Sequence, residues 1–131
     1  RAQELLELFE LDDKANKLGR DLSKGMRQKV SICCALLPDP QLLFFDEPMI
    51  GLDPKAIKNT KQIFKNLKEA GKTILVSTHL IDSVETIADR IMILKDGRII
   101  GNDTLANLRQ KAEQSEDFSL EDLFLEMTKD A

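Results

Sequence analysis

Two short apolar segments separated by one long amphipathic segment constrain the fold of this chain most strongly. Residues 42–45 read Leu-Leu-Phe-Phe, and residues 73–77 read Thr-Ile-Leu-Val-Ser. Continuous apolar runs of this length are typical of buried strands in parallel sheets. Parallel strands need a long crossover connection, which a helix usually supplies. The pattern therefore predicts an α/β fold in which two parallel strands are joined by a helix.

The crossover segment carries both start and stop signals for a helix. Asp53 is placed as the N-cap and Pro54 as the first helical residue, while Gly71 is placed to end the helix in a left-handed conformation. At 100° per residue the segment has a core-facing side and a lysine side, which we interpret as solvated. The core side holds Ile57, Thr60, Ile63, Phe64, Leu67 and Ala70, and the lysine side holds Lys58, Lys61, Lys65, Lys68 and Lys72.

Further elements are expected on both sides of this unit, with a hairpin at the end of the sheet. The composition turns polar after residue 109. We therefore expect residues 1–109 to form one partial domain and residues 110–131 to form a polar linker and helix. Helices are expected over residues 1–11, 23–37, 80–88 and from 119 onward, and hairpin strands over residues 90–94 and 98–101.

Composition and charge exclude several classes of function. The chain has 131 residues, and 19 Lys and Arg against 23 Asp and Glu give a net charge of −4. This acidic balance, without Trp or Tyr, disfavours a general nucleic-acid binder. No apolar run approaches the ~20 residues that span a bilayer, and we expect no signal peptide. The adjacent Cys33 and Cys34 are interpreted as buried apolar residues in a reducing, cytoplasmic setting.

Reactive side chains follow both predicted parallel strands. Asp46 and Glu47 follow the first, and the only histidine of the chain, His79, follows the second. Ligands of open parallel sheets bind beyond the carboxyl ends of the strands. Asp46 could hold Mg²⁺, directly or through water, and Glu47 could orient or deprotonate a water molecule. In the alternative, structural interpretation, the carboxylates only close a turn and His79 only caps a helix.

A third element lies at the start of the helix expected over residues 23–37. Residues 22–26 read Leu-Ser-Lys-Gly-Met, which places Ser23 and Gly25 at the helix N-terminus. Backbone N–H groups and the positive end of the helix dipole favour a phosphate at such a position. An ordinary serine N-cap is the alternative interpretation.

In this order, these segments resemble the ATP-binding-cassette (ABC) ATPase family over nearly the whole chain. Residues 22–26 look like the family's signature motif, usually Leu-Ser-Gly-Gly-Gln, and residues 42–46 look like its Walker B strand. Glu47 then matches the catalytic glutamate, residues 50–53 the D-loop and His79 the switch histidine. The resemblance implies the C-terminal half of a RecA-like P-loop NTPase domain, with a mostly parallel sheet, flanking helices and a terminal β-hairpin.

The resemblance implies a role for each matching residue near the phosphates of ATP. Asp46 would bind Mg²⁺ through water, Glu47 would polarise the attacking water, and His79 would contact the γ-phosphate and sense its presence. Phosphoryl transfer depends mainly on positioning and charge neutralisation, and these groups would supply part of both.

The resemblance also implies a surface that faces a second ABC ATPase domain. Ser23 and Gly25 would touch the γ-phosphate of a nucleotide held mainly by that domain, and Asp53 would organise the contact with it. Two residues depart from the family's pattern, since Lys24 replaces the first Gly of the signature and Met26 the final Gln. Lys24 adds positive charge near a phosphate but removes backbone freedom, and we expect a competent variant of the motif.

The family's Walker A loop has no counterpart in this sequence. Residues 70–73, Ala-Gly-Lys-Thr, match part of it, but Asn66 stands where the pattern needs Gly, and the segment closes a helix instead of opening one. We therefore expect the chain alone to bind MgATP weakly, to show no turnover, and to expose apolar strand edges that favour association or swapping between copies. The initial Arg1 favours an excised piece of a longer protein.

The resemblance favours part of the ATP-binding and hydrolysing subunit of an ABC transporter, with ATP and Mg²⁺ as cofactors. The implied partners are a second ABC ATPase domain, a transmembrane transporter subunit and the missing N-terminal half, with no nucleic acid. These partners would hold the protein at the cytoplasmic face of the cell membrane. Two alternatives stay open: a non-transport ABC protein of the translation-associated or DNA-repair type, and a non-enzymatic interaction module.

Overall fold

The computed structural model describes residues 1–115 and 117–129, which group into the compact units Arg1–His79 and Leu80–Ala131. None of the helices described is long and apolar enough to cross a membrane. The first unit contains α1 (Ala2–Leu8), 3₁₀ turns at Asp12–Lys14 and Gly19–Asp21, α2 (Lys24–Leu36), β1 (Leu42–Asp46), α3 (Pro54–Glu69) and β2 (Thr73–Ser77). The second unit contains α4 (Ile81–Glu85), β3 (Ile91–Lys95), β4 (Arg98–Asp103), α5 (Leu105–Lys111) and α6 (Leu120–Lys129).

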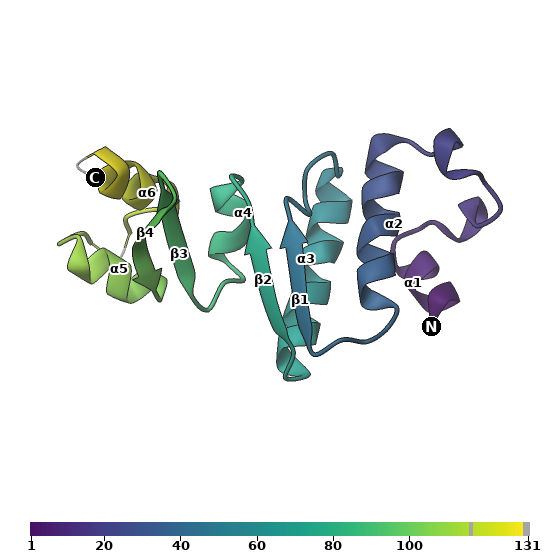
Figure 1. Cartoon of the computed structure of the whole chain (residues 1–131), viewed down its shortest axis with the longest axis horizontal. Helices are drawn as coiled ribbons and strands as arrows, with labels where there is room; N and C mark the ends of the chain where they lie inside the picture. Colours follow the sequence, from purple (N-terminus) through teal and green to yellow (C-terminus); the bar gives the residue numbers. More distant parts are fainter. Residues whose placement is uncertain (116, 130–131) are drawn as a thin grey trace. The chain divides into compact units, whose positions relative to one another are not determined.

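Strands β1 and β2 pair in parallel, as predicted, and α3 forms the crossover between them (Figure 1). The register places Leu42 opposite Thr73 and Asp46 opposite Ser77, so the two strands begin and end together. The carboxyl ends of both strands therefore reach the same edge of the sheet.

Helix α3 begins and ends at the predicted residues. The Oδ1 atom of Asp53 accepts a hydrogen bond of 2.9 Å from the backbone N–H of Ala56, which satisfies one of the unpaired donors of the first turn. Gly71 ends the helix with a φ of +80°, a conformation that costs glycine little. These two caps fix the length of the crossover and so support the register of the strands.

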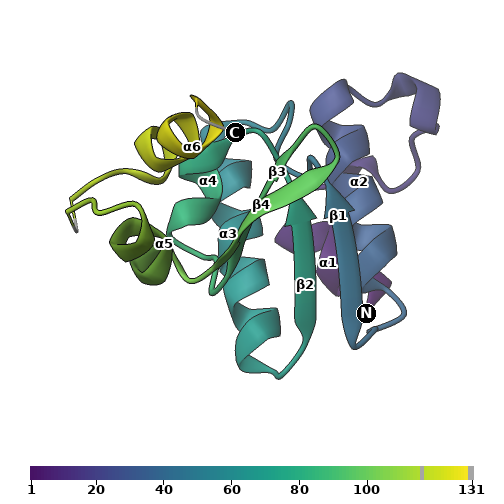
Figure 2. The ribbon, with the colours of Figure 1, turned by 60° about the vertical axis from the view of Figure 1, so that its left-hand side comes forward.

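One face of the β1–β2 pair carries the apolar core of the first unit. Leu43 and Phe45 of β1 are buried, and the ring of Phe45 stacks on that of Phe64 from α3 with 5.0 Å between centroids. Figures 1 and 2 show α3 lying along this pair of strands. The alternating burial of β1 differs from the predicted burial on both faces.

The opposite face of the β1–β2 pair is exposed and apolar. Leu42 and Leu75 are each 50% exposed, and Phe44 is 67% exposed. The continuous apolar run reflects two apolar faces, of which α3 covers one. We call Leu42, Phe44 and Leu75 the outer apolar face; the expectation concerned apolar strand edges, whereas the exposed apolar side chains lie on a face of the sheet.

In the second unit, β3 and β4 form the predicted hairpin. Its turn contains Asp96 and Gly97, both with positive φ, which suits the right-handed twist of the two strands. Within the described residues these strands pair only with each other, so the hairpin forms a separate sheet instead of the predicted end of the β1–β2 sheet. An antiparallel hairpin completes its hydrogen-bond ladder without a third strand.

The second unit has its own apolar core between the hairpin and the helices. Ile93, Leu108, Leu120 and Leu123 are its buried members, and α6 also packs against α4 (Figure 2). The expected start of α6 is confirmed, because the Oγ atom of Ser119 accepts a hydrogen bond of 3.0 Å from the backbone N–H of Asp122. Helix α4 is shorter than the predicted 80–88, and the domain boundary at residue 109 stays a prediction.

The two adjacent cysteines have different environments, and the prediction of a buried pair is wrong for one of them. Cys33 is buried, whereas Cys34 is exposed, because consecutive helical residues point about 100° apart. Burial, with a smaller effect of the neighbouring Cys34 thiol, raises the pKa of the Cys33 thiol to about 11. Both cysteines are free, so neither takes part in a disulfide.

Replacing Phe45 by alanine is expected to lower the free energy of unfolding by about 3–5 kcal/mol, because it empties the buried position beside Phe64. Phe44→Ala is the matched control on the other face of β1, with an expected change below about 1 kcal/mol. Urea unfolding followed by circular dichroism measures both variants. Equal losses would show that the outer apolar face is packed in solution and would contradict this assignment of the two faces.

Candidate functional site

The parallel register brings the predicted acidic pair and histidine to one edge of the sheet. Asp46 is the last residue of β1 and lies opposite Ser77, the last residue of β2. The Ser77 hydroxyl donates a hydrogen bond to the Asp46 carboxylate. Asp46 therefore stays at the exposed end of the strand with one oxygen engaged by its neighbour.

Glu47 lies at the centre of a hydrogen-bond cluster that links β1 to the segment after β2. Its Oε2 atom accepts a hydrogen bond of 2.7 Å from the Thr78 hydroxyl, and its Oε1 atom accepts one of 2.9 Å from the His79 backbone N–H. The imidazole Nδ1 of His79 lies 2.6 Å from the same Oε1. The carboxylate is thus held on both oxygens, and the side chains of Glu47 and His79 are 29% and 69% exposed.

The local environment favours the ionised form of Glu47. Desolvation by itself would raise the pKa of Glu47, but hydrogen bonds from Thr78 and His79 hold this pKa below its usual range. An ionised carboxylate only accepts hydrogen bonds, which matches the donors that surround it. The site therefore presents an oriented carboxylate beside an exposed imidazole.

Ser23 is the N-cap of α2, so residues 22–26 lie at the start of a helix as expected. The Oγ atom of Ser23 accepts a hydrogen bond of 3.2 Å from the backbone N–H of Met26, and both Ser23 and Lys24 are exposed. The Ser23 hydroxyl proton is not used in this cap. The thirteen-residue helix therefore directs its positive end and a hydroxyl donor toward solvent.

The start of α2 packs closely against the loop that follows Glu47. A Cβ atom at Gly25 would lie 2.7 Å from the backbone oxygen of Gly51, closer than real side chains approach. Gly51 has a φ of +77°, and a Cβ there would contact the methylene groups of Lys24 at 3.6–3.7 Å. Glycine at position 25 thus permits a close backbone contact between the signature-like and D-loop-like segments.

Asp53 ends this loop, and both of its carboxylate oxygens have partners within the protein. Besides capping α3, its Oδ2 atom lies 3.9 Å from the Nζ atom of Lys29 on α2. The hydrogen bond from the Ala56 backbone, assisted by the charge of Lys29, lowers the pKa of Asp53. The implied contact of Asp53 with a second domain stays a prediction.

The structure places all six predicted site residues in the first unit and identifies one that sequence reasoning missed. Asp46, Glu47 and His79 gather at the strand ends, and Ser23, Gly25 and Asp53 lie where α2 meets the loop. The missed residue is Gln28, whose amide Nε2 donates to the Glu47 and Pro48 carbonyls at 3.4 and 3.2 Å. The signal for Gln28 is its position three residues after Gly25 on the same helix face.

The donor set at the strand ends fits Mg²⁺ held through one carboxylate and water. The described residues contain no group of three or more His, Cys, Asp or Glu side chains that could hold a metal ion by themselves. Mg²⁺ retains several waters and is commonly bound by one or two carboxylates together with substrate phosphates. Asp46, exposed at the end of β1, is a suitable single carboxylate for that arrangement.

Lys72 of the partial Walker A match has a structural partner. Its Nζ atom lies 2.6 Å from the Asp39 Oδ1 atom and donates to the Asp39 and Pro40 carbonyls. Arg1 approaches the same carboxylate oxygen at 2.6 Å. The prediction that Lys72 belongs to a solvated lysine face is therefore wrong, since its side chain is only 9% exposed.

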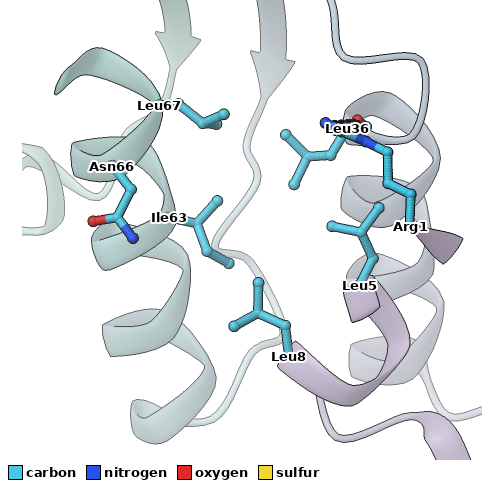
Figure 3. Close-up of a pocket in the computed structure, with 7 residues that line it drawn as sticks. All are labelled: Arg1, Leu5, Leu8, Leu36, Ile63, Asn66 and Leu67. Carbon is cyan, nitrogen blue, oxygen red and sulfur yellow. Dashed lines mark hydrogen bonds between the residues drawn. The ribbon is translucent and has the colours of Figure 1, made fainter. Parts of the chain in front are cut away.

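The first unit also contains a groove between α1, α2 and α3 that is separate from the predicted site residues. Figure 3 shows aliphatic side chains from these helices facing one another across it. The volume of the cavity is about 220 Å³. The lining residues are Arg1, Leu5, Leu8, Leu36, Ile63, Asn66 and Leu67. Its lining is mainly aliphatic, and its charged residue, Arg1, is paired with Asp39, so the groove does not gather the polar groups that phosphate binding requires.

Comparisons with known proteins identify the family of this chain. A family model described as "ABC transporter" matches residues 1–50. The chain is 38% identical over 130 residues to the ABC-type transporter ATP-binding protein EcsA of Bacillus subtilis (strain 168), covering 99% of the chain and 52% of EcsA. It is 38% identical over 109 residues to the daunorubicin/doxorubicin resistance ATP-binding protein DrrA of Streptomyces peucetius, covering 83% of the chain and 33% of DrrA.

A solved structure described as the ATP-binding subunit of an ABC transporter superposes with a TM-score of 0.91 at 38% identity. That match covers 98% of this chain and 53% of the solved one. The fold is thus that of part of a RecA-like ABC ATPase domain. The chain belongs to the ABC transporter ATP-binding protein family and spans from a third to about half the length of the relatives named here.

Replacing Gly25 by alanine is expected to destabilise the protein by about 1–3 kcal/mol, because the new Cβ meets the Gly51 backbone oxygen. Gly19→Ala is the control, since a Cβ at Gly19 meets no atom within 4 Å and the change is expected to be neutral or stabilising. Urea unfolding measures both. A neutral Gly25→Ala variant would contradict the close contact.

Replacing Lys72 by glutamine is expected to raise the pKa of Asp39, because hydrogen bonds from Lys72 and then Arg1 lower it. The folded state with a lowered pKa binds fewer protons than the unfolded state, so stability is lost as the pH falls through this range. That acid loss should be smaller in Lys72→Gln. Carboxyl NMR titration of Asp39 and urea unfolding at pH 7 and pH 3 test this. Lys58→Gln, at an exposed position of α3, should change neither value.

Proposed function

We propose that this chain forms part of the ATP-binding and ATP-hydrolysing subunit of an ABC transporter. The observation that carries the proposal is the Glu47 carboxylate, held by the Thr78 hydroxyl and by the backbone and imidazole of His79. A carboxylate oriented on both oxygens beside an exposed imidazole suits the activation of water next to a phosphate.

In this proposal each residue at the strand ends has a distinct task. Glu47 orients the attacking water and accepts a proton from it. His79 donates a hydrogen bond from Nδ1 to the Glu47 carboxylate and, when both ring nitrogens carry a proton, a second one from Nε2 to the terminal phosphate. Asp46 holds Mg²⁺ through water, and bound Mg²⁺ supplies charge neutralisation at the phosphate oxygens. Ser77 keeps the Asp46 carboxylate in place through its hydroxyl.

The start of α2 is proposed to contact the γ-phosphate of a nucleotide that is held mainly by a second ABC ATPase domain. Ser23 offers its hydroxyl proton, and glycine at position 25 lets the start of the helix pack closely against the backbone of Gly51. Asp53 is proposed to organise the contact between the two domains from the end of the same loop. The exposed Lys24 adds positive charge beside the expected phosphate.

The other partners follow from the family. Relatives are ATP-binding proteins of ABC transporters, and one relative carries a drug-resistance name. We propose a transmembrane transporter subunit as partner, a place at the cytoplasmic face of the membrane, and coupling of ATP hydrolysis to transport. A Walker A segment supplied by an N-terminal half of the domain completes the nucleotide site in this proposal.

The proposal is tested by joining this chain to the portion of EcsA outside the match, which covers 52% of EcsA; the order of the family's motifs implies that this portion is N-terminal. The joined protein is expected to hydrolyse ATP with Mg²⁺, and Glu47→Gln is expected to lower kcat about 100-fold or more with little change in KM. The chain alone is expected to show no turnover. A steady-state assay of phosphate release measures all three.

Glu69→Gln is the matched control, because Glu69 is an exposed glutamate at the end of α3. Its kcat should equal that of the unmodified joined protein. Turnover by the chain alone that Glu47→Gln abolishes would overturn the expected need for a second half. A folded joined protein without ATPase activity would instead favour a non-enzymatic interaction module.

A further inference from the structure

One face of α2 docks along the loop that follows β1. Gly25, Gln28 and Lys29 lie at positions i, i+3 and i+4, which share one side of a helix. Each of the three contacts a different part of the loop. Gln28 meets Glu47 and Pro48, Gly25 meets Gly51, and Lys29 meets Asp53.

The loop begins with an unfavourable backbone conformation at Glu47. Its φ is +46°, in the left-handed region that residues with a Cβ adopt at a cost of about 1–3 kcal/mol. The surrounding structure must hold such a conformation. The Glu47 N–H donates to the Ser77 carbonyl at 2.9 Å, and the Glu47 carbonyl accepts from the Ile50 N–H at 3.3 Å.

Gln28 contacts the same segment through its side-chain amide. The amide donates to two consecutive backbone carbonyls, that of Glu47 at 3.4 Å and that of Pro48 at 3.2 Å. Pro48 is fully buried, so water has little access to its carbonyl. An apolar residue at position 28 would therefore leave this carbonyl without the donor that Gln28 supplies. The backbone that directs the Glu47 carboxylate toward Thr78 and His79 is therefore tied to α2.

We propose that Gln28 is a positioning residue that couples the location of α2 to the orientation of the Glu47 carboxylate. This inference rests on the proposed function of Glu47 in hydrolysis. Ser23 lies at the tip of the same rigid helix, five residues before Gln28. A shift of α2 caused by contacts at Ser23 moves the Gln28 amide, and with it the loop that carries Glu47.

The first test uses the 131-residue chain and does not depend on ATP. Gln28→Met keeps the side-chain volume but removes the amide, and Gln28→Ala removes both. In each variant we expect NMR couplings to show loss of the positive φ at Glu47, and the nuclear Overhauser contacts between Glu47 and the His79 ring to weaken. Gln62→Met is the matched control, because the Gln62 amide bonds only to Asn66 on the exposed side of α3 within the described residues.

The second test uses the joined protein with the EcsA N-terminal portion. Gln28→Met is expected to lower kcat by on the order of 10–100-fold, because a small displacement of a reacting group has effects of this size. KM for ATP should change less than about twofold, since a positioning role acts on the chemical step. A loss of stability alone would lower the active fraction but would leave the φ of Glu47 unchanged in the folded molecules.

The outcomes separate this inference from the proposed function. An unchanged φ and unchanged Glu47–His79 contacts in the Gln28 variants overturn the inference, even where Glu47→Gln abolishes hydrolysis. Activity that survives Glu47→Gln overturns the proposed function, whatever Gln28 does. Altered geometry together with lowered kcat in Gln28→Met, and neither effect in Gln62→Met, supports the coupling.

Discussion

The parallel, in-register pairing of β1 with β2 is the constraint on which the candidate site depends. Because Asp46 pairs with Ser77, the next residues along each strand, Glu47 and Thr78, meet beyond the sheet edge. A shift of one residue would turn the side chains of one strand to the opposite face. The caps of α3 fix the crossover, and burial of Phe45 on Phe64 fixes which face of β1 points inward.

The loop between β1 and α3 is the second organising feature, since three elements meet on its backbone. It leaves β1 at Glu47, passes Gly25 at Gly51 and becomes the cap of α3 at Asp53. Most of its contacts with α2 involve main-chain atoms. The position of the catalytic candidate is therefore set by backbone geometry, while chemically reactive side chains such as Ser23 remain available at the surface.

The sequence predicted the parts of this protein that local rules determine. Helix caps, apolar runs and a two-residue turn act over a few neighbouring residues, so the elements around Asp53, Gly71 and Gly97 were found where they were expected. The contact between Glu47 and His79 was predicted from a general property of parallel sheets, in which the carboxyl ends of the strands lie at one edge. Family resemblance then supplied the roles, which remain proposals.

The features that escaped prediction depend on contacts between distant residues. Lys72 looked like one more solvated lysine, because its partner Asp39 lies 33 residues away in the sequence. The exposure of Phe44 depends on whether another element covers the second face of β1. The separate sheet formed by the hairpin depends on which strands pair with each other. The contacts of Gln28 also depend on distant residues, because its carbonyl acceptors at Glu47 and Pro48 lie 19 and 20 residues away in the sequence.

The left-handed backbone at Glu47 has a consequence for engineering this protein. Glycine would adopt the same conformation without the steric cost, and asparagine would adopt it at a reduced one. Glycine at position 47 would therefore relieve the backbone strain but lose the hydrogen bonds that the carboxylate accepts from Thr78 and His79. Under the proposed function, the backbone favours glycine at position 47 while hydrolysis requires a carboxylate there, so the two demands on this residue conflict.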